Sequence, residues 1–223
     1  DRRQRQMCIR DRQMDYLDYM DSFRYPLAGE FSFRRDVLND IRIPSDWSLE
    51  VGVLSEMYRN YANNRLCQVD IADNYDHKHQ SLSVNDESKG LSKMSIDIAK
   101  GLFRKLATQG VIFSQETFRS IKATYYRKAL DVIENCHNDA VMNGLSLDVH
   151  EEEKAVEMFA QNIIKAGEIF TAIPMERPFL PSWNRVVSAI PDIYDQLIEA
   201  VDKDLKEFQL EKTTVRPLKR ASR

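Results

Sequence analysis

The residues of this chain that could do chemistry are concentrated in one polar run, Asp73-Asn74-Tyr75-Asp76-His77-Lys78-His79. His77 and His79 are two residues apart, so in an extended segment their side chains face the same side. Neutral imidazole is a good ligand for manganese, zinc and similar metal ions. A metal-binding loop is therefore one interpretation, and a surface loop with two ordinary histidines is the other. A closed zinc site would need four ligands at suitable spacing, which the sequence does not offer.

Two further candidates lie earlier in the chain. Glu50 stands in the first turn of a predicted helix. There a carboxylate either only stabilises the positive helix end, or points into a cleft and accepts hydrogen bonds from sugar hydroxyls. In Pro26-Leu27-Ala28-Gly29-Glu30, Gly29 would allow a ligand to approach the backbone closely, or the segment is simply a turn. The sequence contains no GxSxG, P-loop or GxGxxG motif.

Two short strands are predicted in the first third of the chain. Residues 66–71 alternate in polarity and lead directly into the histidine run, and loops that follow strands are the usual ligand-binding positions in α/β folds. Cys67 is expected in the core, within this strand. Residues 31–37 are expected to form a short strand that runs into a helical turn.

Five helices are predicted from apolar residues at helical spacing. The first runs from Trp47 to about Asn63, with Ser45 as its N-cap. The others are expected at 92–108, from Ser114 to a break at Asn143-Gly144, at 151–170, and from Ser182 through Val201. On these elements alone the fold class is α/β, an incomplete sheet followed by a mainly helical extension. Two strands do not form a stable sheet by themselves, so we expect further strands in sequence outside this chain.

Composition excludes several classes of protein. The 223 residues are 43% hydrophobic and 30% charged, as in an ordinary globular protein, and the net charge of -3 does not suit general nucleic-acid binding. Three widely spaced cysteines favour a reducing compartment over a disulfide framework. The sequence shows no apolar run of membrane-spanning length and no signal-peptide core, so a cytoplasmic location without membrane contact is expected.

The N-terminal segment stands apart from the rest. Residues 1–13 are almost entirely Arg, Gln and Asp around three apolar residues, too few to bury a folded segment. The run Met7-Cys8-Ile9-Arg10-Asp11-Arg12 also matches a peptide that appears when sequencing-adapter DNA is translated. We therefore treat residues 1–14 as adapter-derived and expect the chain to be part of a longer protein.

Three motifs together carry a resemblance to a known family. In order, they are Pro26-Leu27-Ala28-Gly29-Glu30, then Asp46-Trp47-Ser48-Leu49-Glu50-Val51-Gly52-Val53-Leu54, then Gln68-Val69-Asp70 leading to His77-Lys78-His79. Over about residues 20–205 the chain resembles the glucosyl-3-phosphoglycerate synthases, which are retaining glycosyltransferases of the GT-A fold. Four regions are implied: the adapter-derived residues 1–14, the C-terminal part of a Rossmann-like GT-A catalytic domain at 15–90, a helical extension at 91–205 and a disordered tail at 206–223.

The resemblance also implies an activity. The family transfers glucose from a nucleotide-glucose donor to 3-phosphoglycerate, a step toward the compatible solute glucosylglycerate. A divalent metal ion, Mg or Mn, bridges the donor diphosphate, and the metal-binding histidine matches His77. Glu50 and Leu27 match residues near the donor sugar, Gly29 lies in the same turn as Leu27, and His79 matches an acceptor-binding position. The resemblance further implies a homodimer.

The chain departs from the family pattern in several places. Ser48 stands where glycine is frequent, and His79 stands where many members carry asparagine. The Asp-x-Asp metal motif, its nucleotide-binding sheet and the Gly-Arg loop that binds the acceptor phosphate have no match here. We therefore expect no turnover from this chain alone. Two alternatives stay open: a related transferase with a mannosyl donor or a glycerate acceptor, and a non-enzymatic helical interaction module.

Overall fold

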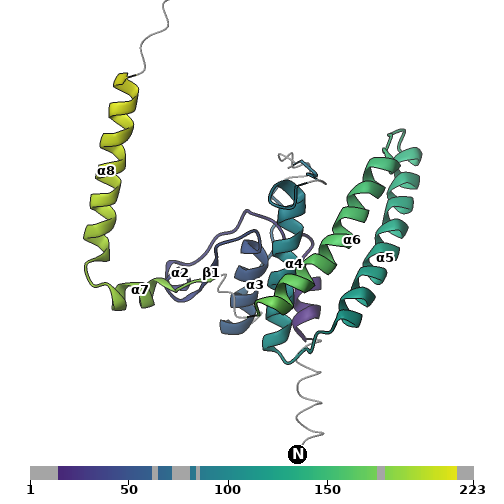
Figure 1. The fold of residues 1–223 in the computed structure, drawn as a ribbon, viewed down its shortest axis with the longest axis horizontal. Helices are drawn as coiled ribbons and strands as arrows, with labels where there is room; N and C mark the ends of the chain where they lie inside the picture. The colour runs from purple at the N-terminus through teal and green to yellow at the C-terminus, as the bar shows by residue number, and fades with distance from the viewer. Residues whose placement is uncertain (1–14, 62–64, 72–80, 84–85, 175–178, 215–223) are drawn as a thin grey trace, which may run out of the picture. The chain divides into compact units, whose positions relative to one another are not determined.

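The computed structural model describes residues 15–61, 65–71, 81–83, 86–174 and 179–214. This part of the chain is mostly helical and contains one two-stranded sheet (Figure 1). The elements are α2 (Arg35–Asp40), β1 (Ile43–Pro44), α3 (Leu49–Asn60), α4 (Gly90–Thr108), α5 (Gln115–Met142), α6 (Val149–Ala172), β2 (Phe179–Leu180), α7 (Trp183–Ala189) and α8 (Ile193–Thr214). They fall into two compact units, residues 1–32 with 42–180 and residues 33–41 with 181–223. None of the described helices is long and apolar enough to cross a membrane.

The three predicted helices in the middle of the chain are confirmed as α4, α5 and α6. Ser114 is the N-cap of α5 and forms a capping box with Thr117, which satisfies backbone groups that a bare helix end leaves unpaired. Gly110 after α4 and Gly144 after α5 have φ values of 93° and 69°, a conformation that glycine adopts without steric cost. Local sequence signals therefore set the ends of these helices.

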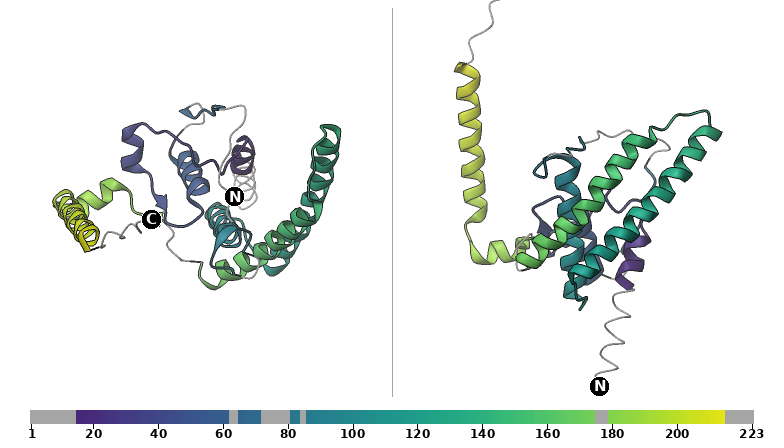
Figure 2. Two further views of the ribbon diagram at one scale, coloured as in Figure 1. Left: turned by 90° about the horizontal axis from the view of Figure 1, so that it is seen from above. Right: turned by 45° about the vertical axis from the view of Figure 1, so that its right-hand side comes forward.

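Helices α4, α5 and α6 pack side by side around an aromatic core, and α5 and α6 form a long antiparallel hairpin (Figures 1 and 2). Phe118 is 1% exposed, and its ring lies 5.0 Å from that of Phe103 and 5.4 Å from that of Phe113. Gly167 of α6 faces the same ring, because a Cβ atom there would lie 2.6 Å from two Phe118 ring carbons. The absence of a side chain at Gly167 thus lets α6 approach α5 closely.

The predicted strands are wrong. The described sheet pairs β1 with β2 in antiparallel register, Ile43 opposite Leu180 and Pro44 opposite Phe179. Residues 31–34 are coil and lead into α2, so the helical turn expected there is present and the strand is not. Within the described residues, the only sheet is therefore this pair of short strands, and the larger α/β sheet expected from the sequence is not seen there.

The segment at 66–71 is coil fastened by its side chains rather than by a strand partner. The backbone N–H of Arg24 donates to Oε1 of Gln68 at 2.8 Å, and Nε2 of Gln68 donates to the carbonyl of Ser22 at 2.8 Å. Arg24 also forms an ion pair of 2.6 Å with Asp70. Cys67 is exposed, which corrects its expected place in the core. The alternating polarity of residues 66–71 suits a β-strand, but among the described residues no strand lies beside this segment to pair with it.

The second unit contains α2, α7 and α8. Asn184 of α7 donates to Oδ1 of Asp40 at 2.7 Å, and the Trp183 indole donates to the Tyr194 hydroxyl at 2.9 Å. The single helix predicted from Ser182 is two helices, because Pro191 lies between them and has no N–H to continue the first. Helix α8 continues to Thr214, past residue 206 where the predicted tail begins.

Candidate functional site

Glu50 lies in the first turn of α3, as predicted, although this helix begins at Leu49 with Ser48 rather than Ser45 as its N-cap. The Asp46 carboxylate orders the approach to the helix, since it accepts the Ser48 backbone N–H at 3.0 Å and the Ser48 hydroxyl. Glu50 is half-buried, and its carboxylate has no hydrogen bond or ion pair to another described residue. It is therefore available to a ligand.

Two glycines let neighbouring elements pack tightly against α3. A Cβ atom at Gly52 would lie 2.0 Å from Cγ of Pro44 and 3.4 Å from the Phe179 ring. A Cβ atom at Gly101 of α4 would lie 2.7 Å from Cβ of Ser48. Both strands of the sheet and α4 thus fix the N-terminal half of the helix that carries Glu50. Because each contact joins separate elements of the fold, residue spacing alone did not reveal them.

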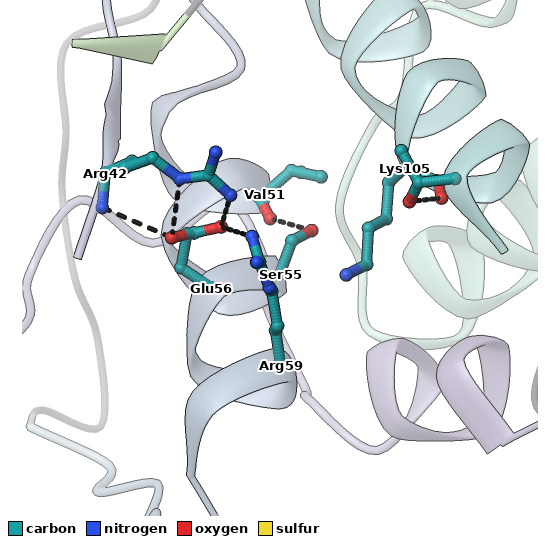
Figure 3. Close-up of polar contacts among 7 residues, drawn as sticks. Arg42, Val51, Ser55, Glu56, Arg59 and Lys105 are labelled. Atoms are coloured by element: carbon teal, nitrogen blue, oxygen red, sulfur yellow. Dashed lines mark hydrogen bonds and ion pairs between the residues drawn. The ribbon is translucent and has the colours of Figure 1, made fainter. Parts of the chain in front are cut away.

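A buried carboxylate of α3 binds Arg42, the residue just before β1 (Figure 3). The Glu56 side chain is 7% exposed and accepts from Arg42 at Nε, at Nη2 and at the backbone N–H, over 3.0–3.3 Å. Arg59 lies 3.8 Å from the same carboxylate. A buried carboxylate is costly unless it is paired and hydrogen-bonded, so this network holds the segment before Asp46 in place. The pairing joins residues 14 apart in sequence on separate elements, so no local pattern marks it.

Residues 15–23 pack onto the other side of α3 through tyrosines. Ser55 donates its hydroxyl proton to the Val51 carbonyl at 2.7 Å, so the Tyr16 hydroxyl, 2.8 Å away, donates to Ser55. Burial raises the pKa of Tyr16 to about 12 and also raises the pKa of Tyr19, whose hydroxyl donates to the Leu54 carbonyl. Both tyrosines therefore stay protonated at neutral pH and act as structural donors.

The Lys105 side chain extends from α4 toward α3 (Figure 3). Its Nζ lies 5.4 Å from the Tyr16 ring centre and 5.7 Å from that of Tyr58, within cation–π range. Burial lowers the pKa of Lys105, partly opposed by the nearby Glu56 carboxylate. These contacts connect α4 to α3 on the side of α3 that faces residues 15–23.

The Pro-Leu-Ala-Gly-Glu segment is a turn in the described structure, closed by a 3.1 Å bond from the Ala28 N–H to the Tyr25 carbonyl. Leu27 is half-buried and Gly29 is exposed. A Cβ atom at Gly29 would meet no atom within 4 Å, and Gly29 does not have a positive φ. Neither packing nor backbone conformation among the described residues therefore requires glycine at this position.

The two predicted histidines, His77 and His79, lie outside the described residues. Within the described ranges, no group of three or more His, Cys, Asp or Glu side chains could hold a metal ion. A cavity of about 540 Å³ lies elsewhere, between residues 15–23 and 66–68, and its walls include Asp18, Tyr58 and Cys67. Of the predicted site residues that the structure describes, Leu27, Gly29 and Glu50, none lines this cavity.

Comparison with known proteins identifies the relatives of the chain. It is 47% identical over 189 residues to a glucosyl-3-phosphoglycerate synthase of Persephonella marina, covering 85% of this chain. It is 44% identical over 196 residues, 87% of this chain, to a protein of the same name from Methanococcoides burtonii. The chain is a homologue of the glucosyl-3-phosphoglycerate synthases. The resemblance inferred from the three motifs is thereby confirmed.

The match to the glucosyl-3-phosphoglycerate synthases covers only part of these relatives. The chain spans about half of their length, 47% and 48%. No family model matches the chain, and no solved structure matches it. Homology to the synthases therefore covers most of this chain but about half of each relative, and the roles of Leu27, Gly29, Glu50, His77 and His79 stay predictions.

Proposed function

We propose that this chain is part of a retaining, metal-dependent GT-A glycosyltransferase that transfers glucose from a nucleotide-glucose donor to 3-phosphoglycerate. The observation that carries the proposal is the 44–47% identity to proteins named glucosyl-3-phosphoglycerate synthase over 85–87% of the chain. The proposal includes a homodimer and no turnover by this chain alone.

The available carboxylate of Glu50 supports a role at the donor sugar. It sits on a helix turn fixed by Gly52, Gly101 and the Asp46–Ser48 hydrogen bonds, so its position is set before a ligand arrives. A fixed acceptor can take hydrogen bonds from two neighbouring sugar hydroxyls and orient the ring, and such preorganisation lowers the barrier to transfer. In this proposal Leu27 packs against the sugar, and the open backbone at Gly29 lets the ligand approach.

The proposal assigns the metal and the acceptor to residues outside the described part. His77 would be one ligand of a Mg or Mn ion, and His79 would donate a hydrogen bond to the phosphate or carboxylate of 3-phosphoglycerate. When bound, a divalent cation would neutralise negative charge on the departing nucleoside diphosphate. We assign no nucleophile to this chain.

Glu50→Gln in the complete gene product tests the sugar-binding role. Removing the charge while keeping the shape weakens hydrogen bonds from the sugar hydroxyls, so kcat/KM for the donor should fall by roughly 10- to 100-fold. Transfer to 3-phosphoglycerate is followed by mass spectrometry with UDP-, GDP- and ADP-glucose. Glu116→Gln, the same change in the first turn of α5, is the matched control and should stay within about twofold of wild type. Equal kcat/KM for Glu50→Gln and wild type would remove Glu50 from the site.

His77→Ala tests the metal site. Loss of a metal ligand typically lowers metal affinity or activity by about 10- to 100-fold or more, so the variant should need more Mn or Mg for half-maximal transfer. His150→Ala, at an exposed histidine in the first turn of α6, is the control. Undiminished metal-dependent turnover in the His77 variant would contradict its role. Transfer to glycerate, or from a mannosyl donor, in preference to the proposed substrates would favour the related transferase instead.

A further inference from the structure

A positively charged lysine of α4 lacks an ion-pair partner among the described residues. Lys105 is half-buried, and its ammonium forms no hydrogen bond or ion pair to another described side chain. It lies instead over the rings of Tyr16 and Tyr58, at 5.4 Å and 5.7 Å. An ammonium has three N–H donors, and burying such a group without an acceptor is unfavourable. The Lys105 ammonium is therefore available to a ligand that supplies acceptors.

Two arginines bring further positive charge to the same region. Arg42 and Arg59 both contact the Glu56 carboxylate, Arg42 at 3.0 Å and Arg59 at 3.8 Å. The Arg59 contact is longer than a hydrogen bond, and its side chain is 57% exposed. In Figure 3, Arg59 lies between Glu56 and Lys105. Three cations thus share one carboxylate, which leaves positive charge in excess.

The excess of positive charge acts on Lys105. Burial is the largest cause that lowers the pKa of Lys105, and the charges of Arg59 and Arg42 lower it further. The Glu56 carboxylate raises this pKa, but it offsets only part of the other effects. An anion beside Lys105 and Arg59 would give acceptors to both side chains and would stabilise the protonated lysine.

The two available side chains suit a phosphate group. A guanidinium can donate two parallel N–H bonds to phosphate oxygens, and a lysine ammonium adds a compact positive charge. A phosphomonoester carries about two negative charges at neutral pH, so it balances the excess of positive charge better than a single carboxylate does. Because Arg59 and Lys105 lie on the packed helices α3 and α4, the site exists before a ligand binds.

We propose that Arg59 and Lys105 form a binding site for a phosphate group, either inorganic phosphate or the phosphomonoester of a small molecule. This inference goes beyond the proposed function, because none of the residues assigned to the sugar, the metal or the acceptor takes part in it. Phosphate binding here and glucose transfer are measured separately. A failure of one therefore leaves the other standing.

Lysine acetylation in the complete gene product tests the site. Acetic anhydride modifies the neutral amine, and mass spectrometry of the digested protein follows each lysine separately. Bound phosphate should slow acetylation of Lys105 at least about threefold, because it covers the amine and raises its pKa. Lys128, an exposed lysine of α5, is the internal control and should react equally with and without phosphate. Sodium chloride at the same ionic strength should not reproduce the protection.

Two arginine substitutions then test the partner of Lys105. Arg59→Gln should abolish protection by phosphate, because the guanidinium is lost. Arg119→Gln, the same change at an exposed arginine of α5, should leave protection intact. Since the Arg59 side chain is more than half exposed, circular dichroism should show an unchanged helix content for Arg59→Gln.

Glycerol 3-phosphate in place of inorganic phosphate distinguishes the two sources of the ligand. Equal protection by both would mean that the site recognises the phosphate group alone, and stronger protection by the ester would mean that it binds a phosphorylated small molecule. The inference is overturned if both protect Lys105 no better than sodium chloride does, or if Arg59→Gln is protected as well as wild type.

Discussion

Helices α6 and α8 are of similar length, 24 and 22 residues, but their apolar residues have different surroundings. In α6, Ala166 is fully buried and Met158 is 5% exposed, because α4 and α5 cover that face of the helix. In α8, the apolar side chains are each more than half exposed at Tyr194, Ile198, Val201, Leu205 and Phe208. Most helical stability in proteins comes from packing of an apolar face, so packing stabilises α6 strongly, whereas these residues of α8 contribute little by packing within the described residues.

The aromatic core of α4–α6 gives the largest expected effect. Phe118→Ala should lower the free energy of unfolding by about 3–5 kcal/mol, because the ring fills the space between Phe103, Phe113 and Gly167. Urea unfolding of the chain, followed by circular dichroism, measures this loss.

Leu205→Ala in α8 is the matched test of the other region. At protein concentrations where the chain is monomeric, the change should alter the free energy of unfolding by less than about 0.5 kcal/mol, because Leu205 is half exposed and alanine favours a helix equally well. A loss comparable to that of Phe118→Ala would show that α8 is buried within a single chain. The contrast between the two regions would then be wrong.

Whether a structural feature could be predicted from the sequence depends on whether its cause is local. The ends of α4 and α5 could be predicted because their signals are local. Ser114 caps the start of α5, and the chain turns at Gly110 and Gly144 where the two helices end. Pro191 is an equally local signal for the break between α7 and α8, although a single helix was predicted from Ser182. Residues 66–71 were predicted wrongly because a strand requires a partner, and partners depend on tertiary structure.

In the candidate site, too, local features could be predicted from the sequence and contacts between separate elements could not. The place of Glu50 on the first turn of a helix could be predicted from sequence, and the structure has it there. The contacts of Gly52 with Pro44 and the pairing of Glu56 with Arg42 could not, because each joins separate elements. The glycosyltransferase role proposed for Glu50 is tested by the Glu50→Gln substitution described above.

The ion pairs of α4 and α8 should also differ in their contribution to stability, by less than the apolar residues do. Asp97 of α4 is fully buried and forms ion pairs with Lys93 at 2.5 Å and Lys100 at 3.0 Å. Burial by itself raises the pKa of Asp97, but the hydrogen bonds and positive charges of the two lysines outweigh burial and hold the pKa below its ordinary value of 3.8. The Lys203–Glu207 pair of α8 is exposed on both sides, where ion pairs contribute little.

Asp97→Asn should therefore lower the free energy of unfolding by about 1–3 kcal/mol at neutral pH, and Glu207→Gln should not change it measurably. A carboxylate whose pKa is depressed by folding stabilises the protein above its unfolded pKa, and that contribution is lost as pH falls through the folded pKa. The difference between wild type and Asp97→Asn should thus be constant above about pH 5 and should shrink as the pH falls below 3.8. Urea unfolding from about pH 7 down to about pH 3 measures both variants. A difference that is independent of pH over this range would mean that Asp97 stabilises α4 by packing rather than by its charge.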